Sequence, residues 1–405
     1  MPITAASIAD LPADLLGAAR ALQPRTVALR RALHRRPELG LELPATRDAV
    51  LRALDGLPLT IRTGTGCDSV VAVLDGARPG PTVLLRGDMD ALPLSEDSGL
   101  EFASEVPGAM HACGHDTHTA MLASAARLLA GRRDRIAGRV VLMFQPGEEG
   151  FHGARHMIDE GVLDEQPEQA YALHISSTVP TGEIHHRPGP IMAAADTLHV
   201  TVTGRGGHAS APQDACDPVP AAAAMVGGLQ ALLTRRVGAQ DSAVLTVARI
   251  AAGTTDNVIP ETAELSGTLR TLSEPVRAML HPEIAEHCRH TALAYGCTAE
   301  VEIVRGYPVT VNDAGAAASL AGVAGQVLGA RACVPMEVPL MGAEDFSYML
   351  QRVPGALAFL GARPPSVDPA TAPPNHSNRV AFDEAAFPAG VATYAGLALA
   401  ATGRG

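Results

Sequence analysis

The sequence predicts an α/β protein in which a mainly parallel-sheet domain is interrupted by an inserted α+β sandwich domain. Apolar, strand-like runs alternate with helical segments over residues 1–189. Between residues 190 and 302 the pattern changes to strands in which apolar and polar residues alternate, and the first pattern returns over 303–405. The expected organisation is therefore one domain made of 1–189 and 303–405, with 190–302 inserted into it.

The first domain is expected to begin with a helix over residues 18–54, since apolar and basic positions alternate there. Short β-type runs follow at 69–74 and 82–90, and a helix begins after the segment GHDTH. Further strands are expected at 139–146 and 170–176. Strands alternating with helices in this order predict a mainly parallel sheet covered by helices on both faces.

Polar residues occur where these apolar strands end. Asp88 and Asp90 end the second run, the pair Glu148 and Glu149 follows the third, and His174 lies at the end of the fourth. Because open α/β sheets bind ligands at the carboxyl edge of their strands, these side chains mark an expected site.

The inserted segment contains three half-exposed strands and two helices. Its strands are expected within 196–207, 242–253 and 261–272, and its helices within 217–236 and 274–296. Such alternating strands are typical of an antiparallel sheet with one solvated face. In the last part of the chain, a helix over 384–402 is expected to pack on the main sheet.

Composition excludes several classes of protein. The chain has 405 residues and a net charge of −12, which argues against nucleic acid or an anionic membrane as its main partner. No signal peptide and no apolar run long enough to span a bilayer are expected. Six scattered cysteines form no CxxC pair. The sequence therefore favours a reducing cytoplasm without a disulfide framework.

The segment MHACGHDTHTA, residues 110–120, concentrates groups that bind metals. Cys113 and His115 flank a glycine ahead of a helix, and a thiolate beside an imidazole suits a borderline-soft divalent ion. Taken alone, the segment fits a buried cysteine near surface histidines equally well. Glu148 and Glu149 alone are more often a solvated acidic turn, and His174 alone is more often a core residue.

The combination favours a metal centre over these separate explanations. One cysteine, several histidines and two glutamates occupy strand ends or loops, and His376 adds an imidazole in a polar loop. Nitrogen, oxygen and sulfur donors in that number suit two metal ions, which together can polarise a carbonyl and activate a water.

The chain resembles the aminoacylase and amidohydrolase family of dinuclear metallopeptidases, in the branch of hippurate hydrolases and auxin–amino-acid conjugate hydrolases. The similar stretches cover nearly the whole chain in the expected order: LHRRPELG, LRGDMDALP, MHACGHDTHTAML, FQPGEEG, ALHIS, GRGGHASAP, NVIPETAELSGTLR, GYPVTVND, MGAEDFSYML and NHS. The resemblance implies a catalytic α/β domain whose inserted domain is a lid that commonly forms a dimer contact.

The resemblance also implies a role for individual residues. The implied metal ligands are Cys113, His115, Glu149, His174 and His376. Cys113 would bridge the two ions, where related peptidases use an aspartate, and Asp88 stands where those peptidases have a histidine. This difference leaves zinc, manganese, cobalt and nickel all open as the native metal.

Glu148 matches the family's general base, and Asp90 matches a carboxylate that orients a ligand. In the lid, His208 would stabilise the oxyanion in the neighbouring subunit's site. Asn257 and Arg270 would bind a substrate carboxylate.

The expected function is metal-dependent hydrolysis of an N-acyl amino acid with a free carboxylate, by a homodimer or a higher homo-oligomer. The alternatives are a dipeptidase or carboxypeptidase with the same centre, a metal-binding protein without catalysis, and a hydrolase that uses Cys113 as nucleophile. A free glutamate beside a ligand glutamate disfavours the non-catalytic protein, and sensitivity to chelators would exclude the cysteine hydrolase.

Overall fold

A computed structural model describes residues 3–403, which form two compact units. The first unit comprises the described residues through Ile191, Val311–Val338, and the chain from Asp345 onward. The second comprises Met192–Thr310 and Pro339–Glu344. The chain thus leaves the first unit, forms the second and returns.

The first unit is built on an eight-stranded sheet with the strand order β1-β2-β4-β3-β5-β16-β6-β15. In that order the strands are Thr60–Thr63, Val70–Asp75, Ala137–Gln145, Arg78–Asp88, Gln169–Pro180, Gly355–Arg363, Ile184–His186 and Cys333–Pro335. The central strands β4, β3, β5 and β16 pair in parallel, whereas β1, β2 and β6 make antiparallel pairs toward the edges. The mainly parallel sheet expected from the sequence is confirmed.

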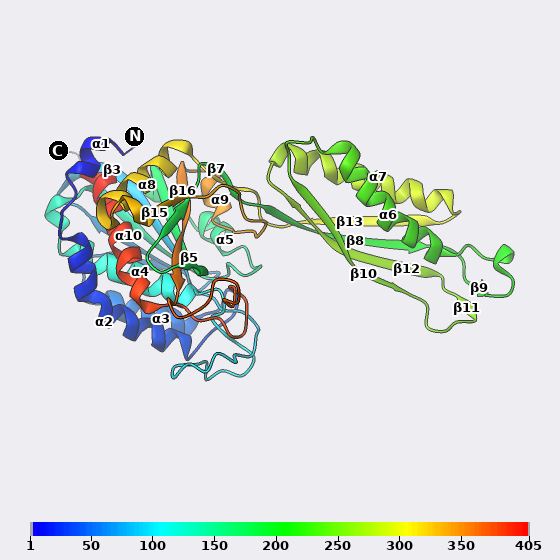
Figure 1. Cartoon of the computed structure of the whole chain (residues 1–405), viewed down its shortest axis with the longest axis horizontal. Coiled ribbons are helices and arrows are strands. Elements are labelled where there is room, and N and C mark those ends of the chain that lie inside the picture. The colour runs from blue at the N-terminus through cyan, green and yellow to red at the C-terminus, as the bar shows by residue number, and fades with distance from the viewer. Residues whose placement is uncertain (1–2, 404–405) are drawn as a thin grey trace. The chain divides into compact units, whose positions relative to one another are not determined.

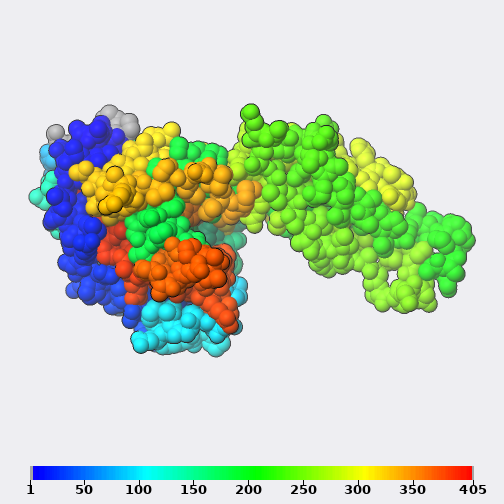
Figure 2. All heavy atoms as spheres, viewed as in Figure 1, coloured from blue at the N-terminus to red at the C-terminus, as the bar shows by residue number. Residues whose placement is uncertain are grey.

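Helices cover this sheet (Figure 1). They are α1 (Ala5–Ala9), α2 (Leu15–His34), α3 (Pro44–Leu54), α4 (His115–Ala130), α5 (Gly153–Asp159), α8 (Ala314–Leu328), α9 (Ser347–Leu350) and α10 (Phe387–Thr402). Helix α10 contacts α2, α4, α8 and β3. All of its residues are buried, and only small patches of it (red) are visible on the face shown in Figure 2.

The single helix expected over residues 18–54 is wrong, because the structure has two helices there. Helix α2 ends at His34 and α3 begins at Pro44. Pro37 lies in the loop between them, and Pro44 occupies the first turn of α3, where its missing N–H costs no hydrogen bond. The intervening segment pairs with the site region, since Ala91 N–H donates to the carbonyl of Glu38 at 2.8 Å.

The second unit is an antiparallel sheet packed against two long helices (Figure 1). Its strand order is β10-β12-β8-β13, with bounds Ala243–Ala252, Thr262–Thr271, Ala194–Thr203 and Thr298–Arg305. Helices α6 (Pro218–Arg236) and α7 (Glu274–Ala294) bury the apolar side chains of these strands in a core of their own. Two short strands, β9 (Gly207–His208) and β11 (Val258–Ile259), pair beyond the ends of β8 and β12. A further pair joins β7 (Gly189–Met192) and β14 (Thr310–Asn312).

Among the described residues, one helical segment, Glu384–Thr402, is long and apolar enough to cross a membrane by length and composition. The expectation that no apolar run would be long enough to span a bilayer is therefore wrong for this segment. However, 94% of its apolar window is buried inside the protein, as expected of a core helix.

Candidate metal centre

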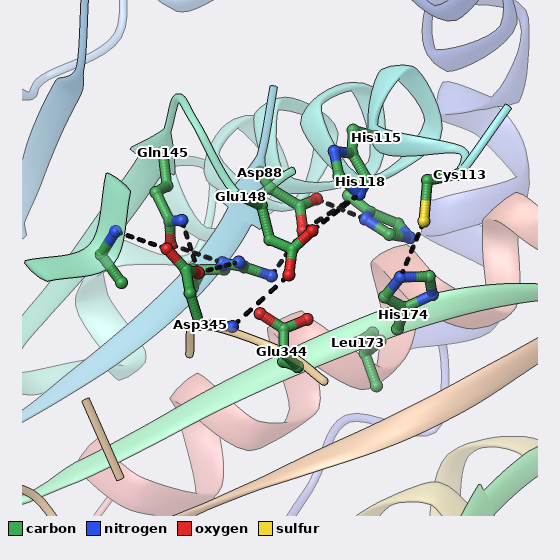
Figure 3. A network of polar contacts seen from close by, with 12 residues as sticks. Asp88, Cys113, His115, His118, Gln145, Glu148, Leu173, His174, Glu344 and Asp345 are labelled. Carbon is green, nitrogen blue, oxygen red and sulfur yellow. Dashed lines mark hydrogen bonds and ion pairs between the residues drawn. The ribbon is translucent and has the colours of Figure 1, made fainter. Parts of the chain in front are cut away.

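The carboxyl ends of the parallel strands bring the predicted site residues together. Asp88 is the last residue of β3, the Glu148–Glu149 turn follows β4, and His115 is the first residue of α4. His174 lies within β5 rather than at its end, because that strand continues to Pro180. Figure 3 shows Cys113, His115 and His174 turned toward one another, with Glu148 beside them.

Gly114 allows the chain to place Cys113 and His115 on the same centre. Its φ of +94° lies in the left-handed region, and a Cβ there would be 2.4 Å from Cγ2 of Ile175. Any other residue would therefore push this loop away from β5. The glycine that separates the two predicted ligands in the sequence is a steric requirement of the site.

The sulfur of Cys113 lies at the centre of two groups of donors. Its Sγ is 3.4 Å from Nε2 of His174 and 3.3 Å from Nε2 of His376. Nε2 of His376 is in turn 3.4 Å from Oε1 of Glu149. Two sets of side chains that could hold a metal ion therefore share this cysteine: Cys113, His115 and His174, and Cys113, Glu149 and His376.

Two atoms of this cluster have the environment expected of metal-binding atoms. Nε2 of His115 and Oε1 of Glu149 are buried and lie 3.9 Å apart. Each has only a long polar contact: Nε2 of His115 is 3.5 Å from Oδ2 of Asp88, and Oε1 of Glu149 is 3.4 Å from Nε2 of His376. A buried polar atom without a well-formed hydrogen bond is costly. A cation between these atoms and the sulfur would remove that cost, so the residues fit the divalent metal ions that the sequence predicts.

In His174 and His115, one ring nitrogen makes a polar contact outside the cluster, and the other ring nitrogen points into the cluster. His174 donates from Nδ1 to the carbonyl of Ile175 at 2.8 Å, and burial lowers its pKa well below the usual value. Its Nε2 therefore carries a lone pair toward the sulfur. His115 directs Nδ1 at Oδ1 of Asp90, 3.3 Å away, which leaves Nε2 for a cation.

Without metal, protons occupy part of this cluster. Hydrogen bonds to Cys113 and Glu149 raise the pKa of His376 to about 10. Burial would raise the pKa of Glu149, but the hydrogen bond from His376 and the charge of His115 lower it overall. Burial, reinforced by the charge of Glu149, raises the pKa of the Cys113 thiol. Metal binding must therefore displace protons from this centre.

Asp90 fixes the turn that carries both glutamates. Its Oδ1 accepts the backbone N–H of Glu148 and its Oδ2 accepts that of Glu149, both at 2.9 Å. With the contact to His115, one buried carboxylate orients an imidazole and two glutamates. This arrangement agrees with the orienting role implied for Asp90.

His118 is a structural histidine despite its place in the same motif. Its Nε2 accepts the backbone N–H of Ile175 at 2.7 Å, so its Nδ1 carries the proton donated to Asp88 at 2.5 Å. Both nitrogens are thus occupied. Although burial opposes it, the charge of Arg86 keeps the pKa of Asp88 well below its usual value. Asp88 is therefore a charged partner of Arg86, whose NH1 donates to it at 2.6 Å.

Asn375 is an important residue that sequence reasoning missed. Its Nδ2 donates to the carbonyls of Cys113 (3.0 Å) and Ile175 (2.9 Å), and its Oδ1 accepts the N–H of Ser177. The side-chain amide of Asn375 thus links the segments that carry Cys113 and His174 to the loop that contains Asn375 and His376. The only available signal was its position in the motif NHS.

The backbone of Asp345 supports the predicted base. Its N–H donates to Oε1 of Glu148 at 3.4 Å, while its own carboxylate accepts from Arg86, Gln145 and the N–H of Ala154 (Figure 3). Glu148 is buried, with 6% of its surface exposed. Asp345 belongs to the motif GAEDF, in which the preceding Glu344 is also buried.

The three predicted lid residues lie in the second unit. His208 in β9 is opposite Val258 of β11, and the N–H of Ala209 donates to the carbonyl of Asn257 at 3.1 Å. Arg270 lies near the other end of β12. The first two residues are therefore neighbours, and the third is distant from them within the same unit.

Comparisons with known proteins agree with this site. A family model described as peptidase family M20/M25/M40 matches residues 84–400. The thermostable carboxypeptidase 2 of Saccharolobus solfataricus is 37% identical over 394 residues, which cover 96% of this chain and 98% of that protein. The N-acetylcysteine deacetylase of Bacillus subtilis is 35% identical over 346 residues, which cover 84% and 89%.

A solved structure is also similar. The YXEP protein of Bacillus subtilis, described as a dinuclear metal binding peptidase from the M20 family, has a TM-score of 0.81 and 31% identity. The match covers 94% of this chain and 98% of that one. Together with the two donor groups around Cys113, it supports a centre for two divalent metal ions.

Replacing Asp90 tests the positioning of this centre. In Asp90→Asn, an amide NH₂ must face one of the N–H groups that the carboxylate accepts, so the turn and His115 should shift. We expect metal affinity to fall by roughly 10–100-fold, as for other residues that orient metal ligands. Titration against a competing chelator measures this change. Asp14→Asn, at an exposed surface pair with Arg132, is the matched control, and equal affinity in both variants would contradict the assigned role.

Proposed function

Because the chain belongs to the peptidase family M20/M25/M40 and is a metal-dependent amide hydrolase, we propose that it cleaves the amide bond of N-acyl amino acids, giving a carboxylate and a free amino acid. The observation that carries the proposal is the pair of donor groups that share Cys113, with the buried carboxylate of Glu148 beside them. The similarity to an N-acetylcysteine deacetylase supports this substrate class.

In this proposal Cys113, His115, Glu149, His174 and His376 would hold two divalent ions, since Cys113 belongs to both groups of donors. The donor set suits zinc, manganese, cobalt or nickel. When bound, the ions supply Lewis acidity, which polarises the substrate carbonyl and makes an attacking water more acidic. The chain's own residues then determine where protons go.

Glu148 is proposed as the general base. Glu148 directly precedes the predicted ligand Glu149, but the two side chains have different partners. Glu149 contacts His376, whereas Glu148 accepts the N–H of Asp345. Glu148 takes a proton from the attacking water and passes it to the departing amine nitrogen. Its low exposure and the fixed backbone of its turn hold it in place without side-chain rearrangement.

His208 is proposed as the oxyanion donor. The N–H of Ser210 donates to its Nδ1 at 3.1 Å, so the neutral ring carries its proton on Nε2. That N–H is a hydrogen-bond donor on an exposed loop. A donor of this kind stabilises the negative charge that forms on the carbonyl oxygen during attack.

We propose that substrate binding involves two chains, a proposal supported by the positions of Asn257 and Arg270 within the second unit. Arg270 lies eight residues along β12 from Thr262, which corresponds to roughly 27 Å of strand, and Asn257 lies beyond that end of the strand. An arginine side chain cannot span this length. If Asn257 and Arg270 bind the same substrate carboxylate, they must come from different subunits, which favours a homodimer in which each lid completes a partner's site.

A second candidate function is a carboxypeptidase or dipeptidase activity at the same centre. The 37% identity to a carboxypeptidase over almost the full chain favours it. Both activities need a free substrate carboxylate and the same base. We propose that the reaction takes place in the cytoplasm, a compartment that the scattered cysteines favour. A small-molecule substrate, without nucleic acid or membrane as partner, accords with the net charge of −12.

Metal removal and a substrate panel test the proposal. Chelation should abolish hydrolysis, and Mn²⁺, Co²⁺, Zn²⁺ or Ni²⁺ should restore it, because the proposed reaction depends on the Lewis acidity that the ions supply. N-acetyl and N-benzoyl amino acids should be hydrolysed faster than dipeptides, and their carboxamide analogues should be poor substrates. Full activity of metal-free protein would refute the metal-dependent mechanism, whereas faster hydrolysis of dipeptides would favour the second candidate.

The two adjacent glutamates form a matched pair of variants. Glu148→Gln keeps the shape but cannot accept a proton, so kcat should fall roughly 10²–10⁴-fold while both metals remain bound. Glu149→Gln removes a charge next to His376 and should lose metal affinity as well as rate. Metal stoichiometry measured beside kcat distinguishes them, and retention of metal by Glu149→Gln with loss by Glu148→Gln would reverse the assignment.

Mixed subunits test the two-chain site. Glu148→Ala and His208→Ala homo-oligomers should each be nearly inactive, the second by roughly 10²–10³-fold for one lost oxyanion donor. After subunit exchange, a mixed dimer should contain one site with both residues intact and regain part of the activity. Exchange is verified with differently tagged chains, and absence of recovery in proven heterodimers would show that His208 acts within its own chain.

A further inference from the structure

Two cysteines that are distant in the sequence lie on neighbouring segments of the second unit. Cys216 lies in the loop before α6, and Cys297 lies in the turn between α7 and β13. Sγ of Cys216 is 3.2 Å from the carbonyl oxygen of Gly296, and Sγ of Cys297 is 3.6 Å from that of Asp217. Each sulfur thus contacts the residue next to the other cysteine, so the two segments lie side by side with both thiols between them.

The packing around the two sulfurs leaves no room for a larger residue at the neighbouring glycines. A Cβ on Gly296 would be 3.2 Å from Sγ of Cys216, and one on Gly204 would be 3.2 Å from Sγ of Cys297. Gly296 also has a φ of +73°, which favours glycine. The backbone therefore approaches the thiols closely on both sides and holds them in one place.

The two thiols differ in accessibility. Cys297 has 2% of its surface exposed, whereas Cys216 is only partly buried. Burial raises the pKa of the Cys297 thiol, and a charge on Cys216 raises it further. An external reagent would therefore reach Cys216 first, with Cys297 as its nearest second thiol.

We propose that Cys216 and Cys297 are a thiol modification site that closes to an intrachain disulfide when the protein meets a small oxidised disulfide such as glutathione disulfide. The Cys216 thiolate attacks one sulfur of the reagent, forms a mixed disulfide and releases one glutathione thiolate, which takes up a proton. The Cys297 thiolate then attacks Sγ of Cys216 and releases the second glutathione. Two protein thiols lose two electrons and two protons, and one reagent disulfide is reduced to two thiols.

The new bond would fasten the base of the loop that carries His208. The backbones of Arg205 and Cys216 exchange two hydrogen bonds, at 2.9 and 2.8 Å, and so close the loop between them. A disulfide to Cys297 joins this closure covalently to the end of α7. Because the cross-link limits the unfolded chain over the residues between the two cysteines, it should stabilise the second unit. The inference does not depend on the proposed reaction.

Mass spectrometry of the metal-loaded, full-length protein tests the site. After treatment with glutathione disulfide, the wild-type chain should lose the mass of two hydrogen atoms, and proteolysis should yield a linked pair of peptides that contain Cys216 and Cys297. Its thermal unfolding temperature should rise and return to the starting value after reduction. A chain that keeps six free thiols, or one that stops at a glutathione adduct on Cys216, would overturn the proposal.

Single substitutions make the order of the two steps visible. Cys297→Ser should accumulate the glutathione adduct on Cys216, because the second thiol is missing. Cys216→Ser should stay unmodified at the buried Cys297. Cys333→Ser, which changes another partly buried cysteine, is the matched control and should still form the cross-link. Adduct formation at Cys297 in Cys216→Ser, or loss of the cross-link in Cys333→Ser, would contradict the assignment.

Discussion

The carboxylate of Asp90 is the interaction on which the rest of the site depends. It accepts the backbone N–H groups of Glu148 and Glu149 and contacts Nδ1 of His115. A base and two predicted ligands thereby take their positions from one buried group at the end of a central strand. Because that group is held by backbone hydrogen bonds rather than by flexible side chains, the distance between base and ligand is set by the fold itself.

Around this group, the chain collects donors that would be unfavourable without a cation. Nε2 of His115 and Oε1 of Glu149 are buried and make only long polar contacts. Hydrogen bonds to Cys113 and Glu149 raise the pKa of His376 to about 10. Divalent ions would replace protons and satisfy these atoms together. The burial and charge that raise the pKa of His376 and Cys113 therefore also favour a divalent cation at this place.

The sequence predicted the fold class because it depends on local patterns, whereas the roles of the individual residues of the centre were assigned through the family resemblance. Apolar strands followed by Asp88 or Glu148 can be recognised from the sequence without knowledge of tertiary contacts. Cys113 and His115 can be recognised in the same way, because they lie on either side of Gly114 in a single loop. Contacts between distant segments could not be read in this way. The hydrogen bonds of Asn375 to Cys113 and Ile175, and that of Asp345 to Glu148, join segments 197 or more residues apart. The break between α2 and α3 was missed because periodicity continued on both sides of Pro37.

The central claim is that each chain binds two divalent metal ions and that both have the sulfur of Cys113 as a ligand. X-ray absorption spectroscopy of the metal-loaded protein tests this claim most directly. Combined with elemental analysis, it should show two divalent ions per chain, sulfur among the ligands of both, and a metal–metal distance of about 3.5–4 Å. Cys113→Ser should remove the sulfur scattering from both ions together. A single ion per chain, or two ions of which only one has sulfur as a ligand, would contradict the shared position of Cys113.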